Sequence, residues 1–131
     1  MKRIFTALLT MLFVGSLLLA QAPKVILITP DDRDDAQYEF LMRNGFDVEK
    51  FFPGSSLAAA GQDTIDKLNA ADLIIVGRSP NSGQFDGDDQ PVWNALTAPL
   101  VVNSQWIARR NRIGMLNTTS AYHQNEMPNV A

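Results

Sequence analysis

Two uninterrupted aliphatic runs dominate the hydrophobic pattern of this chain. Lys24–Thr29 contains the first, and the second, Leu73–Val76, lies between Asp72 and Gly77. Strands that are buried on both faces carry such runs, as in parallel sheets with helices on each side, whereas strands with one exposed face alternate. The pattern therefore predicts two buried strands, and Pro30 is expected to end the first.

Helical and alternating patterns predict the elements around these two strands. A helix is expected to begin at Asp34 or Asp35, which suit an N-terminal cap, and to end at Gly45. The rest of the pattern predicts an outer strand at Phe46–Phe52, a helix within Leu57–Ala71, a helix capped by Asp88 or Asp89, a strand at Pro99–Asn103, a short link at Ser104–Asn111 and a fifth strand at Arg112–Leu116.

This order of elements indicates an α/β fold. We expect a doubly wound, mostly parallel, five-stranded flavodoxin-like sheet with helices on both faces. The chain has 131 residues, which leaves room for a single domain, expected at 23–116. Residues 117–131 are polar and lack periodicity, so we expect a mobile C-terminal tail there.

The N-terminus has the pattern of a secretory signal peptide over residues 1–22. Lys2 and Arg3 are followed by the apolar stretch Ile4–Ala20 and by the small residues of Ala20-Gln21-Ala22. An uncleaved membrane anchor is the alternative, because the stretch is near the shortest length that spans a bilayer and Pro23 is unfavourable after a cleavage site. We expect cleavage, a secreted or periplasmic location, and no stable membrane anchoring after cleavage.

Charge and cysteine content exclude several classes of protein. The formal net charge is −3, and it becomes −5 without residues 1–22, because that segment contains Lys2 and Arg3 and no acid. An acidic chain lacks the basic surface that nucleic acid requires, so no nucleic-acid partner is expected. The chain has no cysteine, which excludes disulfides, thiolate metal sites and cysteine nucleophiles.

Segments along most of the chain resemble a known class of domain. The layout from Lys24–Thr29 to Ala71–Val76 resembles the flavodoxin-like core of class I glutamine-amidotransferase-like domains, including the branch with trehalose-utilisation-type proteins. Trp93–Val102 followed by Arg109–Gly114 is similar to the ending of uncharacterised secreted domains of this type. The resemblance covers Lys24–Leu116 and implies the fold. Amidotransferases need a cysteine nucleophile, so it does not imply glutamine hydrolysis here.

A second resemblance is to response-regulator receiver domains. Pro30-Asp31-Asp32 follows the first predicted strand, Asn44–Val48 follows the first helix, and Asp72–Val76 resembles the receiver strand that ends in the phosphorylated aspartate. Gly77 occupies the position of that aspartate. The resemblance therefore implies at most a degenerate receiver.

Candidate site residues gather after the predicted strands. In open α/β sheets, ligands bind beyond the carboxyl ends of the strands, and the loop Ser79–Asp89 there is polar. Arg78 could pair with an aspartate or hold an anionic ligand. The candidate ligand-binding residues are Asp31, Asp32, Arg78, Ser79, Asn81, Ser82 and Trp106.

Two further features of this edge leave alternatives open. Asp31 and Asp32 offer carboxylate oxygens to Mg²⁺ or Ca²⁺, or they are a solvated loop beside a helix start. Trp106, Phe85 and Tyr122 are aromatic residues in loops that could stack on a sugar ring, whereas Trp93 is expected in the core.

Complete catalytic patterns are not found in the sequence. Ser79 follows Gly77-Arg78, but the second glycine of a nucleophile elbow is missing. His123 is the single histidine and lies in the tail. No dinucleotide or P-loop glycine motif occurs, and the acids near Asp31 disfavour a flavin phosphate. No cofactor is expected beyond a Mg²⁺ or Ca²⁺ ion.

These observations favour a secreted, non-catalytic binding or interaction module on an amidotransferase-like scaffold. A carbohydrate, a small polar ligand or a protein is the expected partner. A metal-assisted hydrolase of small polar or glycosidic substrates is the alternative interpretation. It would use the acid cluster, which consists of Asp31, Asp32, Asp34 and Asp35. A degenerate receiver is the third.

Overall fold

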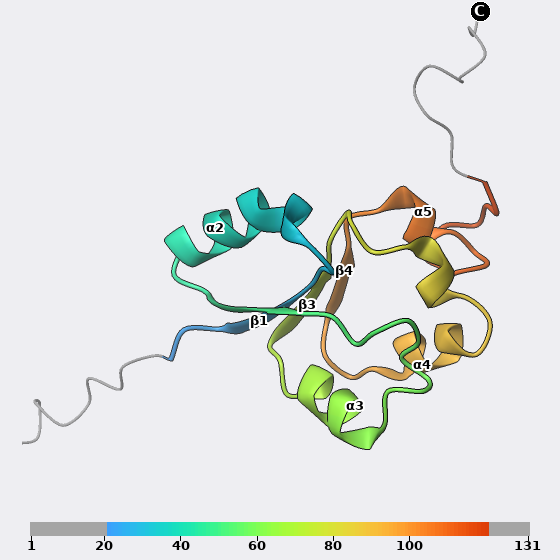
Figure 1. The fold of residues 1–131 in the computed structure, drawn as a ribbon, viewed down its shortest axis with the longest axis horizontal. Helices are drawn as coiled ribbons and strands as arrows, with labels where there is room; N and C mark the ends of the chain where they lie inside the picture. Colours follow the sequence, from blue (N-terminus) through green and yellow to red (C-terminus); the bar gives the residue numbers. More distant parts are fainter. Residues whose placement is uncertain (1–20, 121–131) are drawn as a thin grey trace, which may run out of the picture.

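A parallel four-stranded sheet forms the centre of the computed structural model, which describes residues 21–120 (Figure 1). The strands lie in the order β2-β1-β3-β4, and all neighbours are parallel. The α/β fold with a parallel sheet is confirmed. The strands are β1 (Lys24–Ile28), β2 (Asp47–Phe51), β3 (Leu73–Val76) and β4 (Leu100–Val102).

The two central strands are those with uninterrupted aliphatic runs. β1 lies between β2 and β3, and β3 lies between β1 and β4. Both faces of β1 are covered, and Val25, Ile26 and Leu27 are completely buried. The absence of polar alternation thus follows from the central position of the strands.

Helices cover the two faces of the sheet unequally (Figure 1). One face carries α2, and Val25 and Leu27 of β1 pack there with Leu41. The other face packs through Ile26 and Ile28 into a larger apolar cluster. The helical segments are η1 (Asp32–Asp34), α2 (Asp35–Arg43), α3 (Gln62–Asn69), η2 (Ser82–Phe85), α4 (Asp89–Ala95) and α5 (Gln105–Ala108).

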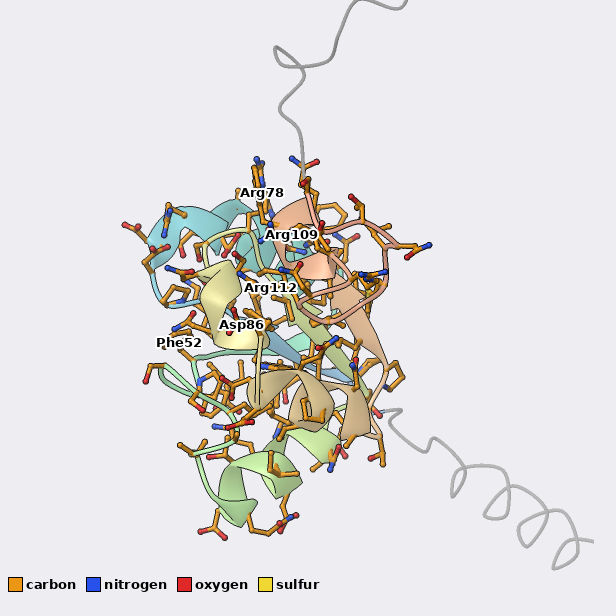
Figure 2. All side chains as sticks on the ribbon, turned by 90° about the vertical axis from the view of Figure 1, so that its right-hand side faces the viewer. Phe52, Arg78, Asp86, Arg109 and Arg112 are labelled. Carbon is orange, nitrogen blue, oxygen red and sulfur yellow. The ribbon has the colours of Figure 1, made fainter. Side chains whose placement is uncertain are left out.

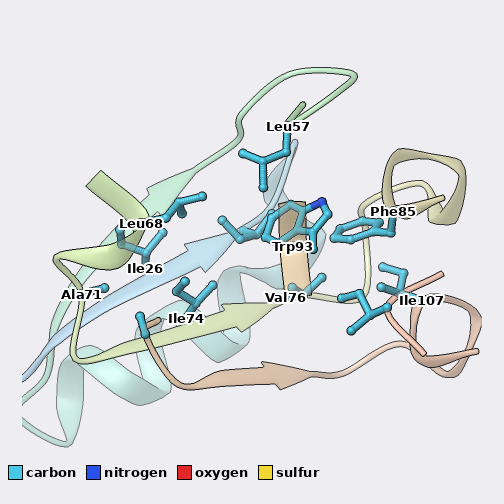
Figure 3. Packing of buried hydrophobic residues seen from close by; sticks show 12 residues of the cluster. Ile26, Leu57, Leu68, Ala71, Ile74, Val76, Phe85, Trp93 and Ile107 are labelled. Carbon is cyan, nitrogen blue, oxygen red and sulfur yellow. The ribbon is translucent and has the colours of Figure 1, made fainter. Parts of the chain in front are cut away.

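Two aromatic residues occupy the middle of the larger cluster (Figure 3). Trp93 of α4 is 2% exposed, and its ring centroid lies 4.8 Å from that of Phe85. The indole Nε1 donates a hydrogen bond to the Gln84 carbonyl oxygen at 3.3 Å. The prediction of a core Trp93 is confirmed. The suggestion that Phe85 could stack on a sugar is wrong, because Phe85 is 1% exposed.

The predicted fifth strand at Arg112–Leu116 is not formed. This segment turns, with the Arg112 and Gly114 amides donating to the Arg109 carbonyl oxygen at 3.0 and 2.9 Å. An isolated bridge between Arg109 and Leu116 is its only ladder contact in the part of the chain that the structure describes. Ile113 is buried in the larger cluster, but Met115 is half exposed. One buried side chain anchors a turn, whereas a strand needs a whole face to bury.

Acidic residues at two helix starts have other roles than the predicted caps. Neither Asp34 before α2 nor Asp88 before α4 makes a side-chain cap hydrogen bond. The buried Asp89 carboxylate instead accepts from the Ala58 amide at 2.7 Å and from Ser56 Oγ at 2.8 Å. It thereby attaches the loop before α3 to α4. The predicted end of α2 is confirmed, since Gly45 has a φ of +85°.

Some predictions concern residues outside the described range. Apart from Gln21 and Ala22, the predicted signal peptide lies there, as do Tyr122 and His123 of the tail. Within residues 21–120, no helix has both the length and the hydropathy needed to cross a membrane. The first tail residues contact the domain, because Thr118 accepts a hydrogen bond from the Arg110 amide at 2.8 Å.

Candidate functional site

The loops after β1, β3 and β4 meet at one edge of the sheet, because parallel strands all end there. From β1 the chain continues to β2 on one side, and from β3 it continues to β4 on the other. The reversal of direction between β1 and β3 is the position where open α/β sheets bind ligands. Thr29–Asp34 and Gly77–Asn81 form the two sides of this position.

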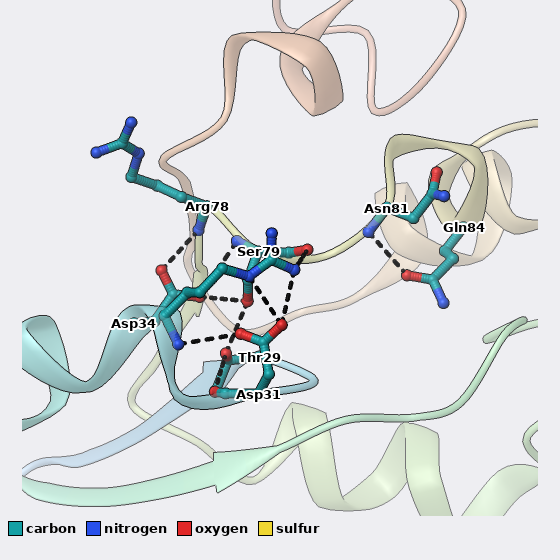
Figure 4. Close-up of polar contacts among 8 residues, drawn as sticks. Thr29, Asp31, Asp34, Arg78, Ser79, Asn81 and Gln84 are labelled. Atoms are coloured by element: carbon teal, nitrogen blue, oxygen red, sulfur yellow. Dashed lines mark hydrogen bonds and ion pairs between the residues drawn. The ribbon is translucent and has the colours of Figure 1, made fainter.

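Asp34 joins these two loops through a buried hydrogen-bond network (Figure 4). Its carboxylate accepts from the Arg78 amide at 2.9 Å, the Ser79 amide at 3.3 Å and the Ser79 hydroxyl at 2.7 Å. The Ser79 and Thr29 hydroxyl oxygens are 2.9 Å apart. Asp34, Ser79 and Thr29 are all buried. A buried carboxylate is tolerated because its oxygens have donors on several sides.

Gly77 makes this close approach of the two loops possible. A Cβ atom at this position would overlap the Asp34 carboxylate, at 2.6 Å from its Cγ, and would lie 3.0 Å from the Ile28 carbonyl oxygen. The Gly77 amide also donates to that Ile28 oxygen at 3.0 Å. The glycine is therefore required for space.

The hydrogen bonds to Asp34 also determine its protonation. Burial raises the pKa of the Asp34 carboxyl, but hydrogen bonds from Ser79, Arg78 and Thr29 together outweigh burial and hold the pKa below its ordinary value. The exposed Asp31 carboxylate pairs with Arg33, at 2.8 Å from Nε and 2.7 Å from Nη2. Hydrogen bonding by Arg33 lowers the pKa of Asp31.

An open groove of about 710 Å³ lies beside the network. Its lining consists of Arg78, Asn103, Ser104, Gln105 and Trp106. A smaller hollow of about 230 Å³, lined by Arg33, Arg78 and Ser79, adjoins it through Arg78. The Arg78 side chain extends away from Asp34 (Figure 4), and it makes no ion pair or hydrogen bond with any residue in the range 21–120. Its guanidinium is thus exposed between the two hollows.

Trp106 reaches the groove from α5, and Arg109 lies against its ring. The Arg109 Cζ atom is 5.2 Å from the Trp106 ring centroid, and Arg109 Nε donates to the Trp106 carbonyl oxygen at 2.8 Å. Arg109, which is labelled in Figure 2, also donates to Ser82 Oγ at 3.3 Å and to the Thr119 oxygen at 3.1 Å. These contacts fix the wall of the groove that α5 provides.

The predicted site residues therefore separate into groups. Arg78 and Trp106 line the groove, whereas Ser79 belongs to the buried network. Asn81 caps η2 through the Gly83 amide at 2.9 Å, and its own amide donates to Gln84 Oε1 at 3.1 Å. Ser82 contacts Arg109, Asp31 pairs with Arg33, and Asp32 is exposed.

Three groove residues and Arg33 are absent from the predicted set. Asn103, Ser104 and Gln105 follow the carboxyl end of β4 directly. The rule that selected Ser79 and Asn81 after β3 applies equally to β4, so these polar residues could have been found from the sequence. No sequence feature marked Arg33 as a site residue, because it lies between acids in a stretch that is typical of a solvated loop.

The acid cluster divides among different partners. Asp31 pairs with Arg33, Asp34 binds the backbone after β3, and Asp35 pairs with Lys50 of β2. Within residues 21–120, no three histidine, aspartate or glutamate side chains lie close enough together to hold a metal ion. The assignment of Mg²⁺ or Ca²⁺ to Asp31 and Asp32 remains a prediction.

The Ser79 hydroxyl is engaged in the network, where it donates to Asp34 Oδ2. A nucleophilic serine needs a base within hydrogen-bond reach, and a carboxylate of lowered pKa is a weak base. The geometry is thus better suited to holding a polar ligand at Arg78 than to activating Ser79.

Comparisons of this chain with protein-family models, curated proteins and solved structures gave no match.

Proposed function

We propose that this chain is an exported, non-catalytic binding module that takes a small polar ligand in the groove beside Arg78. One observation carries the proposal. An exposed guanidinium without a partner in residues 21–120 lines a groove of about 710 Å³ at the ligand-binding edge of a parallel sheet. A guanidinium recognises planar anions with paired hydrogen bonds, so the ligand is expected to carry a carboxylate.

The remaining groove residues favour a carbohydrate as the carrier of that carboxylate. The polar side chains of Asn103 and Ser104 line the groove, and amide and hydroxyl groups form hydrogen bonds with the hydroxyl groups of a sugar. Trp106 adds an aromatic surface to the lining. An acidic sugar, such as a uronic acid, combines these properties.

We also propose that the domain is a flavodoxin-like, doubly wound fold on an amidotransferase-like scaffold. The order β2-β1-β3-β4, with the first strand inside the sheet, supports this class. The proposal includes no glutamine hydrolysis, because the chain has no cysteine.

Replacing Arg78 by alanine is expected to weaken binding of a uronic acid about 10- to 100-fold, the loss of a charge-assisted hydrogen-bond pair. Isothermal titration of the protein with galacturonate and with neutral galactose measures this. Arg43→Ala is the matched control, because Arg43 is an exposed arginine on α2 away from the groove. Equal galacturonate affinity in the wild type and Arg78→Ala would refute the assignment. Binding of galactose as tight as that of galacturonate would show that the ligand needs no carboxylate.

Export makes a separate prediction. When the full sequence is expressed in an exporting bacterial host, the recovered protein is expected to begin at Pro23, since the residues before it match a signal peptide. Intact-mass spectrometry of the periplasmic and membrane fractions measures this. Full-length mass confined to the membrane fraction would support the uncleaved anchor instead.

A further inference from the structure

β4 is an edge strand with one side unpaired. It pairs with β3 in the register Ile74–Leu100, Ile75–Val101 and Val76–Val102. The Pro99 oxygen and the Asn103 amide bond toward β3, at 2.8 and 3.0 Å. Backbone groups of alternate residues point the same way in a parallel ladder, so those of Leu100 and Val102 point outward. No loop or helix within residues 21–120 supplies hydrogen bonds to them.

The two edges of the sheet differ in their protection against pairing. β2, at the other edge, carries Asp47, Glu49 and Lys50 in a strand of five residues. Charged side chains on an edge strand prevent another strand from adding to it. β4 consists of three aliphatic residues, and the sequence contains no charged residue from Gln90 to Ala108. Among residues 21–120, the β4 edge thus lacks the charges that protect β2 and can accept a further strand.

An apolar strip accompanies the open edge. Val101 is 45% exposed and lies beside Ile75, on the face that α2 covers. Phe40 of α2 is 60% exposed. Gln37, three residues earlier and thus on the same side of the helix, accepts a hydrogen bond from Asn103 Nδ2 at 3.0 Å. Phe40 therefore lies on the β4 side of α2, and Phe40 and Val101 form the apolar strip, which is exposed among residues 21–120.

We propose that β4 pairs in antiparallel orientation with β4 of a second copy, about a two-fold axis at Val101. In this register, Leu100 of each copy exchanges backbone hydrogen bonds with Val102 of the other, which satisfies every outward group of the strand. Val101 faces Val101 of the second copy as a non-hydrogen-bonded pair with close Cβ atoms. The two Val101 and two Phe40 side chains then cover one another.

A second copy fits this edge better than another kind of strand. A two-fold interface must be self-complementary. Two copies of a neutral strand with an odd number of residues meet this requirement when the two-fold axis passes beside the central residue, which is Val101 in β4. Two acidic chains repel each other in general, but the charge-free stretch lets them approach here. β4 also lacks flanking charged residues that would select a peptide by its charge.

Charge variants at position 101 test the two-fold axis directly. The protein expressed from the full sequence is expected to sediment as a dimer, and both Val101→Lys and Val101→Glu as monomers, because like charges would face each other across the axis. An equimolar mixture of the two variants is expected to recover the dimer, because opposite charges then face each other. Analytical ultracentrifugation over a concentration series measures all four samples.

Met115→Lys is the matched control, because Met115 is 50% exposed, close to the 45% of Val101, and lies outside the strip. It is expected to remain dimeric. A cooperative circular-dichroism melt would show that each variant folds, and a melting temperature below that of the dimeric wild type is expected for the monomers. A wild type that is monomeric throughout, or a dimer that persists in Val101→Lys, would overturn the proposal. A mixture that stays monomeric would overturn the two-fold arrangement. Association through the apolar N-terminal stretch would be insensitive to position 101 and is thereby distinguished.

Discussion

Asp34→Ala is expected to lower the free energy of unfolding by about 3 kcal/mol, the cost of breaking a buried, charge-assisted hydrogen-bond network. The substitution removes the acceptor of the Arg78 amide, the Ser79 amide and the Ser79 hydroxyl. Asp34 and Ser79 are both buried, so water does not readily replace the lost acceptor. Urea denaturation followed by circular dichroism measures the change at neutral pH.

Asp32→Ala is the matched control for this substitution. Asp32 belongs to the same acidic segment but is exposed, and an exposed substitution of this kind is expected to change stability by less than about 0.5 kcal/mol. Equal stability of Asp34→Ala and Asp32→Ala would show that the network contributes nothing. If Asp34→Ala does not fold, Asp34→Asn provides the measurement, because it keeps one acceptor oxygen and the shape of the side chain.

The acid dependence of stability should change in the same variant. An aspartate whose pKa is lower in the folded than in the unfolded state adds stability above the ordinary aspartate pKa. That contribution is lost as the pH falls through the folded-state pKa. The pKa of Asp34 is lowered, so the stability advantage of the wild type over Asp34→Ala should decrease as the pH falls below about 5. Asp31, whose pKa is also lowered, is present in both proteins and cancels.

The part of the fold that sequence could predict is the part decided by local pattern. The aliphatic runs of β1 and β3 specify central strands because no polar residue offers a face to water. Gly45 ends α2 through its own positive φ. The prediction of a fifth strand was wrong because Ile113 has the hydrophobicity of a strand residue but lies in a turn, from which its side chain packs into the core. Hydrophobicity predicts that such a residue is buried, but it does not predict whether a strand or a turn carries the residue.

The sequence could predict that the candidate site lies at the carboxyl edge of the sheet, but it could not predict which residues contact one another there. Parallel strands place the loops after β1, β3 and β4 together, which is why Arg78 and Trp106 line one groove. Nothing local distinguishes Asp34 from the acids beside it. Its partners Arg78 and Ser79 lie more than 40 residues later in the chain, and the fold alone brings them together. For the same reason Phe85, in a polar stretch, could not be recognised as core.

The buried network also explains how the exposed arginine is held. The Asp34 carboxylate binds the backbone amide of Arg78, while the Arg78 side chain points to the groove. Arg33 adds a hydrogen bond to the Ser79 carbonyl oxygen at 3.2 Å. Stability and the proposed binding site therefore depend on the same loop contacts. A variant that disturbs the network should affect both properties, whereas Arg78→Ala should affect binding alone.

Gly77→Ala is expected to lower the free energy of unfolding by about 3 kcal/mol, the combined cost of overpacking and of displaced hydrogen bonds. The added methyl group would overlap the Asp34 carboxylate and press on the Ile28 carbonyl oxygen. Gly83→Ala is the matched control in the same loop region. Its nearest neighbour, Asn81 Oδ1 at 3.3 Å, belongs to an exposed side chain that can move, so a cost below about 1 kcal/mol is expected.

The double variant Asp34→Ala/Gly77→Ala identifies which neighbour meets the methyl group. Alanine at position 34 removes the overlapping carboxylate, so the two costs should not add. The double variant is expected to be at least about 1 kcal/mol more stable than their sum, as for residues in direct contact. Urea denaturation of the four proteins of this cycle at neutral pH measures the difference. Additive costs would mean that strand β1, through Ile28, takes up the overlap, and that the position of Asp34 does not depend on a glycine at the end of β3.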